Sequence, residues 1–409
     1  MKLIPKAYLQ ILGKRDFLVL SLVNFLFQAT TSFILLALVV TVFSKTGSNF
    51  GVSGVIVSFS LSGLFLMAFA GVLADLVDRK KIIVLANFVE FFIILAILLA
   101  IEKVFASIVF SFFYFAVNAL YLPAASASVA QVVKRNKLQP ANSIFVFTMA
   151  GGQMAGFFAA SVVQFFFGHI WALVICEILT LFALYLSTFL PSLVPKGRER
   201  SPLEVTKQLF NAFIYVFGKS GVWFFFTIFA FMQGLIAVGV TLGPGFFNEI
   251  LGVGVKKSPL IIFPAISLGV ILGTIYMHFP RVHESRFVAL GLGVIGVASF
   301  LVASFIKYDL LASKVLLLPV SIFITLLGFG VMVIMISSRT VLQQTIPHYS
   351  QGTLFGAAII LSSFFAGFMS PFSAALEALF GYVNFLLFGG IIFMLSSLVL
   401  VKVGERWKF

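Results

Sequence analysis

Charged residues are scarce in this chain of 409 amino acids. They occupy 10% of the positions, whereas about a quarter of the residues in soluble domains are charged. Apolar residues occupy 61% of the positions, and 53 of the residues are phenylalanine. A soluble core of this length does not need so many apolar side chains, so the surplus is expected to face lipid. The sequence therefore predicts an integral membrane protein.

Cysteine is almost absent, and histidine is rare. The single cysteine, Cys176, excludes an intramolecular disulfide and a cluster of thiolate metal ligands. Among the four histidines, His278 and His283 are five residues apart, which does not match the i, i+4 pair of a zinc protease. No Walker loop and no nucleophile elbow occurs. We therefore expect no catalytic residues, no metal and no cofactor, which argues against an enzyme.

Basic residues outnumber acidic ones by 27 to 13, and the net charge is +14. A basic excess is typical of nucleic-acid-binding proteins. Here, however, the basic residues lie in short gaps between apolar runs, the pattern that encodes membrane topology. We therefore expect no nucleic-acid partner. With the N-terminus in the cytoplasm, 21 of the 27 basic residues fall on the cytoplasmic side, which predicts that both termini are cytoplasmic.

Twelve apolar runs are long enough to cross a bilayer, for which about 20 residues are needed at 1.5 Å per residue. These runs cover residues 17–43, 51–74, 82–101, 104–131, 141–168, 170–190, 221–247, 259–280, 287–306, 315–338, 353–376 and 381–402. The predicted fold class is thus an all-α membrane protein with twelve transmembrane helices.

The longest polar interruption, residues 191–220, lies near the middle of the chain. Within it, apolar residues recur at helical spacing, which predicts an amphipathic helix at the cytoplasmic interface. These residues are Leu209, Phe210, Phe213, Ile214 and Phe217. The predicted organisation is a six-helix half over 1–190, a cytoplasmic linker over 191–220 and a second six-helix half over 221–409.

The gap between the second and third runs carries a motif. Residues 71–81 read GVLADLVDRKK, which resembles the loop motif G-x-L-A-D-x-x-G-R-K-x of the major facilitator superfamily. Asp78 replaces the second glycine of that motif, and Leu76 stands where a basic residue is usual. The Asp-Arg-Lys-Lys ending resembles a bacterial drug and macrolide exporter branch of the superfamily. Weaker similarities at 138–143 and 343–352 extend the resemblance over almost the whole chain.

The resemblance implies a twelve-helix transporter that works by alternating access, as a monomer, in the cytoplasmic (inner) membrane of a prokaryote. It implies a gating role for Gly71, Asp75, Arg79, Lys80 and Gly352. Asp75 would face a helix N-terminus near Gly352, where free N–H groups carry partial positive charge. Arg79 would add a charge-assisted hydrogen bond to this contact. The alternative for Arg79, Lys80 and Lys81 is that they only obey the positive-inside rule.

Several polar side chains lie near the predicted midplane, where an unpaired polar group is costly. We count depth along each run at 1.5 Å per residue. The candidates are the amides Asn24, Gln28, Asn118, Gln153 and Gln233, together with Tyr114 and Tyr121 on the same face as Asn118. In the family fold, the helices that carry the amides reach a central cavity, which predicts an uncharged, hydrogen-bonding and aromatic substrate site. The alternative is hydrogen bonding between helices, worth ~0.6 kcal/mol per contact.

Only two acidic residues, Glu90 and Glu177, lie well inside the apolar runs. The resemblance places both on helices that are peripheral in the family fold. Each is a candidate for proton coupling, because burial favours the neutral form of a carboxyl group. The alternative for each is a structural pairing with a neighbouring helix.

The leading hypothesis from the sequence is a secondary active transporter that exports amphipathic or hydrophobic small molecules, with proton antiport as the mode of coupling. Its partners would be the lipid bilayer, the small substrate and protons. The alternative is a lysophospholipid or other lipid transporter of the same fold, which would run downhill without a midplane acid. A receptor or scaffold that does not transport predicts that disabling Asp75 leaves function intact.

Overall fold

The computed structural model describes residues 10–134, 137–195, 207, 214, 216–218, 221–277, 284–309, 313–345 and 351–403. Within these residues the regular secondary structure is entirely helical. The prediction of an all-α chain is therefore confirmed for the described part.

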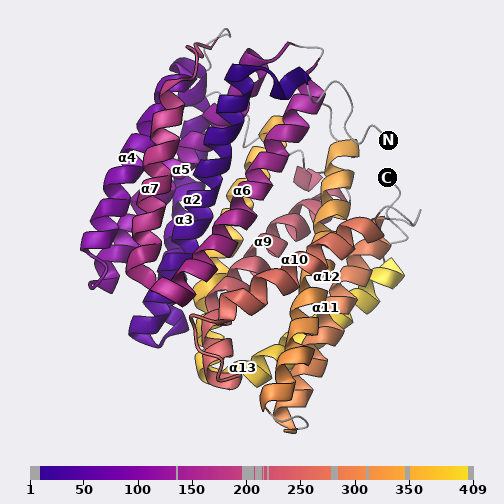
Figure 1. Ribbon diagram of the computed structural model, residues 1–409. Coiled ribbons are helices and arrows are strands. Elements are labelled where there is room, and N and C mark those ends of the chain that lie inside the picture. The colour runs from indigo at the N-terminus through magenta and orange to yellow at the C-terminus, as the bar shows by residue number, and fades with distance from the viewer. Residues whose placement is uncertain are drawn as a thin grey trace, which may run out of the picture. The chain divides into compact units, whose positions relative to one another are not determined.

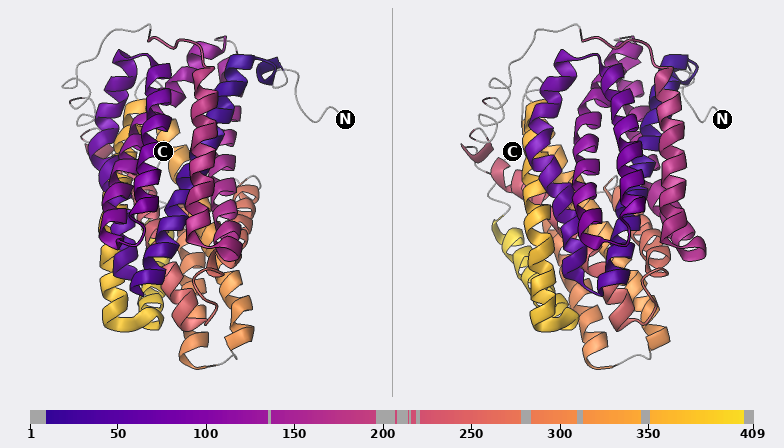
Figure 2. Two further views of the ribbon diagram at one scale, coloured as in Figure 1. Left: turned by 60° about the vertical axis from the view of Figure 1, so that its left-hand side comes forward. Right: turned by 90° about the vertical axis from the view of Figure 1, so that its left-hand side faces the viewer.

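The chain divides into two compact units, and each is described by itself. The N-terminal unit comprises residues 1–45 and 61–206. Its helices run side by side (Figures 1 and 2). They are α2 (Arg15–Thr46), the second part of α3 (Asn49–Leu76), α4 (Arg79–Leu99), α5 (Val104–Val132), α6 (Leu138–Phe167) and α7 (His169–Thr188). Helix α4 packs on both α5 and α7, and α6 packs on α7.

The C-terminal unit comprises residues 46–60 and 207–409. It contains the first turns of α3 and the elements α9 (Val222–Gly245), η2 (Phe246–Ile250), α10 (Ser258–Tyr276), α11 (Glu284–Lys307), α12 (Ser313–Thr345) and α13 (Gln351–Val403). Helix α12 packs against α9, α10 and α11, and α13 packs against α9 and α11. The element η2 is a short π-helix that continues directly from α9.

Eleven helices in the described residues are long and apolar enough to cross a membrane. The last of them covers two of the predicted runs, because α13 consists of two helices joined at Gly381. Gly381 has φ 76° and ψ 161°, a left-handed conformation that glycine adopts without steric cost. The sequence predicted separate helices on either side of this point. The structure joins them at one residue rather than through a loop.

The boundary between the two units crosses the chain three times, at the end of α2, within α3 and in the linker. Residues 46–60, which open α3, pack with the C-terminal unit, while residues 61–76 of the same helix pack with the N-terminal unit. The sequence predicted a division only at the linker over 191–220, and it did not predict that α3 is shared between the units. Of the predicted interface helix, only Ile214 and Phe217 lie among the described residues, so that prediction falls largely outside them.

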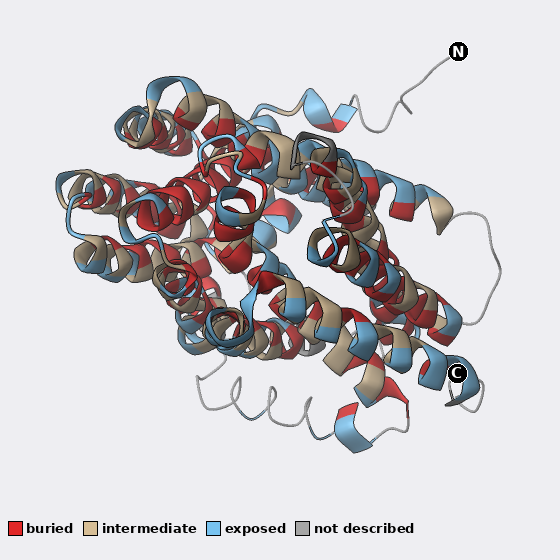
Figure 3. Cartoon of the chain, turned by 90° about the horizontal axis from the view of Figure 1, so that it is seen from below, coloured by how far each residue is buried: buried red, intermediate tan, exposed pale blue. Residues whose placement is uncertain are grey.

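Apolar side chains form the interior of each unit. The core of the N-terminal unit includes Phe17, Leu20 and Phe27 of α2, which pack with residues of α3, α4, α5 and α6. Figure 3 shows buried residues where helices meet and exposed residues on their outward sides. Many exposed residues are large and apolar, for example Phe105 at 79% and Phe147 at 76% exposure. Such surfaces suit contact with lipid.

Two glycines bring α6 close to α2. A Cβ atom at Gly152 would collide with the backbone carbonyl of Phe25, and one at Gly156 would collide with that of Ala29. The Gly-x-x-x-Gly spacing thus places two helix backbones in direct contact, as small residues do between membrane helices. This close approach brings the polar side chains of α2 and α6 within reach of one another.

Candidate functional site

Three polar residues of α2 lie on one face of the helix, because Asn24, Gln28 and Thr31 are four and three residues apart. Gln153 of α6 donates a hydrogen bond from Nε2 to Oε1 of Gln28 at 3.1 Å. Asn118 of α5 donates from Nδ2 to Oγ1 of Thr31 at 2.7 Å. The structure therefore brings together three of the predicted midplane amides, Gln28, Asn118 and Gln153, across three helices.

These amides differ in their access to solvent. Gln28 is buried, Asn118 is partly buried and Gln153 is exposed. The group therefore reaches from the interior of the N-terminal unit to its accessible surface. An amide that already makes one hydrogen bond still has free donors and acceptors for a ligand. We call Gln28, Thr31, Asn118 and Gln153 the amide cluster.

Asn24 lies deeper than the amide cluster. Its side chain is fully buried, and Nδ2 lies 3.5 Å from both the Phe145 carbonyl oxygen and Oγ1 of Thr148. This geometry joins α2 to α6 and fits the predicted alternative of a hydrogen bond between helices. Gln233 lies on α9 in the C-terminal unit, where it is partly buried. Its place at a substrate site therefore stays a prediction from the sequence.

The N-terminal unit also contains a buried acid. Glu90 of α4 is fully buried, and neither carboxyl oxygen has a hydrogen-bond partner among the described residues. Tyr114 and Tyr121 of α5 are also fully buried. The hydroxyls of Thr30 and Thr31 of α2 both donate to the Phe27 carbonyl oxygen.

The two tyrosines lie in the interior of the unit rather than lining an accessible surface. Tyr121 stacks on Phe27, with ring centroids 3.4 Å apart and planes at 7°. Neither tyrosine hydroxyl has a hydrogen-bond partner among the described residues, so no continuous chain of hydrogen bonds leads from Asn118 to Glu90.

The other predicted acid, Glu177, lies on α7. Both of its carboxyl oxygens are buried without a hydrogen-bond partner among the described residues, although the residue as a whole is only partly buried. The adjacent Cys176 thiol is buried and lies 3.7 Å from the Thr30 carbonyl oxygen, so it packs between α7 and α2.

The loop between α3 and α4 is fixed by Asp78. Its Oδ1 atom accepts from the backbone N–H of Lys80 at 3.0 Å, which caps the N-terminus of α4. The carboxylate also accepts from the backbone N–H of Leu193 at 2.8 Å and from the Ser192 hydroxyl at 2.9 Å. Asp78 therefore fastens the segment that follows α7 to the start of α4.

Arg79 strengthens the same junction. Its Nε donates to the Ala74 carbonyl at 3.0 Å, and Nη1 donates to the Ala127 carbonyl at 3.1 Å. Nearby, Gln131 donates from Nε2 to the Val194 carbonyl at 3.0 Å. The ends of α3, α5 and α7 are thus tied to the start of α4 by hydrogen bonds within one unit.

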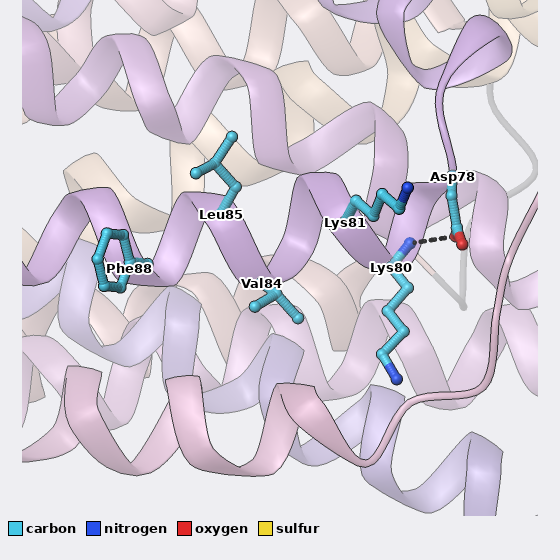
Figure 4. Close-up of a pocket in the computed structure, with 6 residues that line it drawn as sticks. All are labelled: Asp78, Lys80, Lys81, Val84, Leu85 and Phe88. Atoms are coloured by element: carbon cyan, nitrogen blue, oxygen red, sulfur yellow. Dashed lines mark hydrogen bonds between the residues drawn. The ribbon is translucent and has the colours of Figure 1, made fainter.

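A shallow groove of about 410 Å³ lies beside this junction. It is lined by Asp78, Lys80, Lys81, Val84, Leu85 and Phe88 (Figure 4). At 100° per residue, the last three lie on the side of α4 opposite Glu90. The groove is therefore separate from the polar interior of the unit.

Replacing Asp78 with alanine is expected to destabilise the protein by about 1–3 kcal/mol, because a helix cap and two further acceptors are lost. Burial raises the pKa of Asp78. The hydrogen bonds from Leu193, Ser192 and Lys80 and the charge of Lys81 outweigh burial, so the pKa lies below its ordinary value of 3.8. The stabilisation is therefore present above pH 3.8 and is lost as pH falls through the lowered pKa.

Thermal unfolding in detergent at pH 7 and at pH 3 measures this effect. The wild type should lose part of its advantage over Asp78→Ala at the lower pH. Asp16→Ala is a matched control, because Asp16 is exposed in the first turn of α2. An equal loss of stability in both variants at pH 7 would contradict the assigned role of Asp78.

Comparison with known proteins decides the family. The sequence pattern of the Major Facilitator Superfamily matches residues 20–371. The chain belongs to this superfamily. It is accordingly a secondary transporter with many membrane-spanning helices, and not an enzyme. No curated protein matches it.

Solved structures of other superfamily transporters share the fold. The nucleoside transporter NupG is 15% identical with a TM-score of 0.71, and the alignment covers 96% of this chain and 99% of NupG. A POT family transporter in complex with 5-aminolevulinic acid is 11% identical with a TM-score of 0.74, covering 96% of each chain. A D-xylose–proton symporter is 16% identical with a TM-score of 0.71, covering 94% and 96%. These likenesses show the fold and do not favour the drug exporter branch.

The superfamily motif is only partly described by the structure. Gly71 lies within α3 with open space beside it, and Arg79 and Lys80 begin α4. The Asp75 side chain and the surroundings of Gly352 lie outside the described residues. Their gating contact therefore stays a prediction from the sequence.

Sequence reasoning missed Thr31 and the role of Asp78. Thr31 joins the amide cluster, but hydroxyl residues are common in membrane helices and give no signal of their own. Asp78 was interpreted as a departure from the superfamily motif. Its position directly before a helix is a recognised signal for an N-cap, and would have predicted part of its role.

Proposed function

We propose that this superfamily member exports amphipathic or hydrophobic small molecules by alternating access, in exchange for protons. In this proposal it works as a monomer in the cytoplasmic membrane of a prokaryote, with both termini inside. The observation that supports the proposal best is the amide cluster at the accessible side of the N-terminal unit, which also contains the buried Glu90.

The chemistry of the cluster favours a substrate without a fixed strong charge. Its members are amides and a hydroxyl, which donate and accept hydrogen bonds but carry no net charge. Aromatic residues lie close by, including the stacked pair Phe27 and Tyr121. Such a mixture of apolar walls and a few polar groups is typical of sites for small amphipathic ligands.

Proton coupling is assigned to Glu90. A carboxyl group that is buried without a hydrogen-bond partner is stable only in its neutral, protonated form. Releasing the proton would require water or a changed environment, which alternating access supplies. In this proposal, occupancy of the amide cluster and protonation of Glu90 influence each other, because both lie in the N-terminal unit. The gating contact of Asp75 with the start of α13 completes the proposed cycle.

Transport by the purified protein in liposomes of known orientation tests the proposal. The two probes are a lipophilic cationic dye and a fluorescent lysophospholipid, each followed with and without a proton gradient. Dye movement that stops when the gradient collapses would support proton-coupled export. Lysophospholipid movement that ignores the gradient, without dye movement, would contradict it and favour a lipid transporter of the same superfamily.

A further inference from the structure

The groove beside the start of α4 lies where a membrane span begins. Helix α4 (Arg79–Leu99) is long and apolar enough to cross a bilayer, and Lys80 and Lys81 belong to its first turn. Basic residues at the end of a span lie at the level of the lipid headgroups, and the side chains of the following turns contact hydrocarbon. In Figure 4 the two lysines stand at one end of the groove, and its apolar lining follows along the helix.

An exposed apolar stripe continues from Lys81 along the same side of α4. Leu85, Phe88 and Phe92 follow Lys81 after four, seven and eleven residues, so the four side chains lie within about 60° of one another around the helix. The three apolar side chains are 60%, 47% and 51% exposed, so the described part of the chain leaves them largely uncovered. The stripe is therefore available to the acyl chain of a lipid whose headgroup lies at Lys81.

The charge at the start of α4 is positive. Residues 78–81 contain three basic side chains and one acidic one, a net charge of +2. The Asp78 carboxylate already accepts three hydrogen bonds within the junction, and Arg79 donates to backbone carbonyls. Neither Lys80 nor Lys81 forms an ion pair with a carboxylate of the described residues. This end of the groove is therefore complementary to an anionic headgroup.

The shape of the groove separates a lipid from a soluble anion. Sites for soluble small molecules bury about 70–90% of the surface of the ligand. This groove is shallow, and its whole lining comes from α4 and the residue before it, so it does not enclose a ligand in that way. A phospholipid needs no such enclosure, because the rest of its surface stays in the bilayer. Lysine ammonium groups also bind phosphate well, as point charges.

We propose that the groove binds one anionic phospholipid, with its phosphate at Lys80 and Lys81 and one acyl chain along Leu85 and Phe88. The distribution of basic residues predicts that this end of α4 is cytoplasmic, and the cytoplasmic leaflet is the one with a negative surface potential. The bound lipid is not a transported substrate. The inference therefore goes beyond the proposed function and does not depend on it.

The lipid also offsets an unfavourable feature of α4. The first turn of this helix contains no acidic residue, although the N-terminus of a helix carries partial positive charge and disfavours cations. A phosphate group beside Lys80 and Lys81 reduces the repulsion that these side chains meet there. Because the lipid binds this arrangement in the folded protein, its binding raises the temperature of unfolding.

Native mass spectrometry of the purified protein in detergent tests the proposal. The probes are phosphatidylglycerol and phosphatidylcholine with the same acyl chains, and the dissociation constant of each is measured from a titration. The wild type should bind phosphatidylglycerol more tightly. The double variant Lys80→Gln/Lys81→Gln should lose about fivefold in affinity for each lysine, and so bind both lipids alike. Glutamine keeps the backbone N–H of residue 80 that Asp78 accepts, so the variant should unfold at the wild-type temperature without lipid.

The matched control is Lys256→Gln/Lys257→Gln, because these adjacent lysines are also exposed and lie between η2 and α10. It should bind phosphatidylglycerol as the wild type does. Phe88→Ala should weaken binding by about threefold to tenfold through the loss of apolar contact. Phe147→Ala, at an exposed phenylalanine of α6 in the same unit, should not.

Three outcomes would overturn the proposal. Equal binding of the two lipids by the wild type, or an equal loss in both lysine variants, would mean that the groove does not select an anionic lipid. Competition by inorganic phosphate would indicate a site for soluble anions. A dimeric mass that disappears in Phe88→Ala would show that a second copy of the chain covers the stripe. Binding is read without transport, so a failure of proton-coupled dye export leaves this site standing.

Discussion

Replacing Glu90 with glutamine is expected to reduce proton-driven transport by about tenfold or more, to the level of empty liposomes. Glutamine keeps the size and neutrality of the protonated acid but cannot release a proton. The proton gradient can therefore no longer drive transport of the substrate. Exchange of substrate between two equal pools needs no net proton movement and should continue. Dye flux under a proton gradient and dye exchange without one are measured on the same preparation.

Glu177→Gln is the control for this prediction. Glu177 is the other carboxyl group inside the helices of the N-terminal unit, and it is only partly buried. It should retain gradient-driven flux. If Glu177→Gln loses the flux and Glu90→Gln keeps it, the proton site belongs on α7 and its assignment to Glu90 is wrong. Loss in both variants together with lost exchange would indicate damage to the substrate site instead.

Asn118→Leu is expected to raise the substrate concentration for half-maximal transport by about fivefold to tenfold. The change removes the hydrogen bond to Thr31 and leaves a partly buried hydroxyl without that donor, which costs about 1–3 kcal/mol. It also removes the amide through which a ligand would contact the cluster. Dye flux at several concentrations separates this effect on affinity from an effect on the maximal rate.

Gln164→Leu makes the same kind of chemical change elsewhere in the unit. Gln164 of α6 is 2% exposed, and neither of its amide atoms has a hydrogen-bond partner among the described residues. Removing an unsatisfied buried amide is neutral or stabilising. Transport should therefore keep its concentration dependence in this variant. An equal change in both variants would assign the effect of Asn118→Leu to helix packing rather than to substrate binding.

The helices were predictable because their signal is strong and local. The run predicted at 170–190 becomes α7 at His169–Thr188, and the run at 82–101 becomes α4 at Arg79–Leu99. The junction at Gly381 was not predictable in this form, because a glycine between two apolar runs fits a loop as well as a sharp bend. Its left-handed backbone is visible only in the structure.

The sequence predicted which polar residues belong to the amide site, but it predicted less well which of them form hydrogen bonds with each other. Depth along a helix identifies Gln28, Asn118 and Gln153, since each is a polar residue in an apolar run. Depth does not tell which amide faces which helix, and it gave no reason to pair Asn118 with Thr31. The contact of Asn49 with Glu377 joins residues 328 positions apart, and nothing local in the sequence points to it.

Helix α3 is one continuous helix with residues in both units. Asn49 opens the helix, and Asp75 of the superfamily motif lies near its other end, about 39 Å away at 1.5 Å per residue. A continuous helix resists bending. A displacement of one end therefore moves the other end directly, without a series of side-chain contacts between them. The contacts of Asn49 with α13 and the proposed gating at Asp75 would then act on opposite ends of one helix. A proline placed at Ser62, between them, would let each end move without the other.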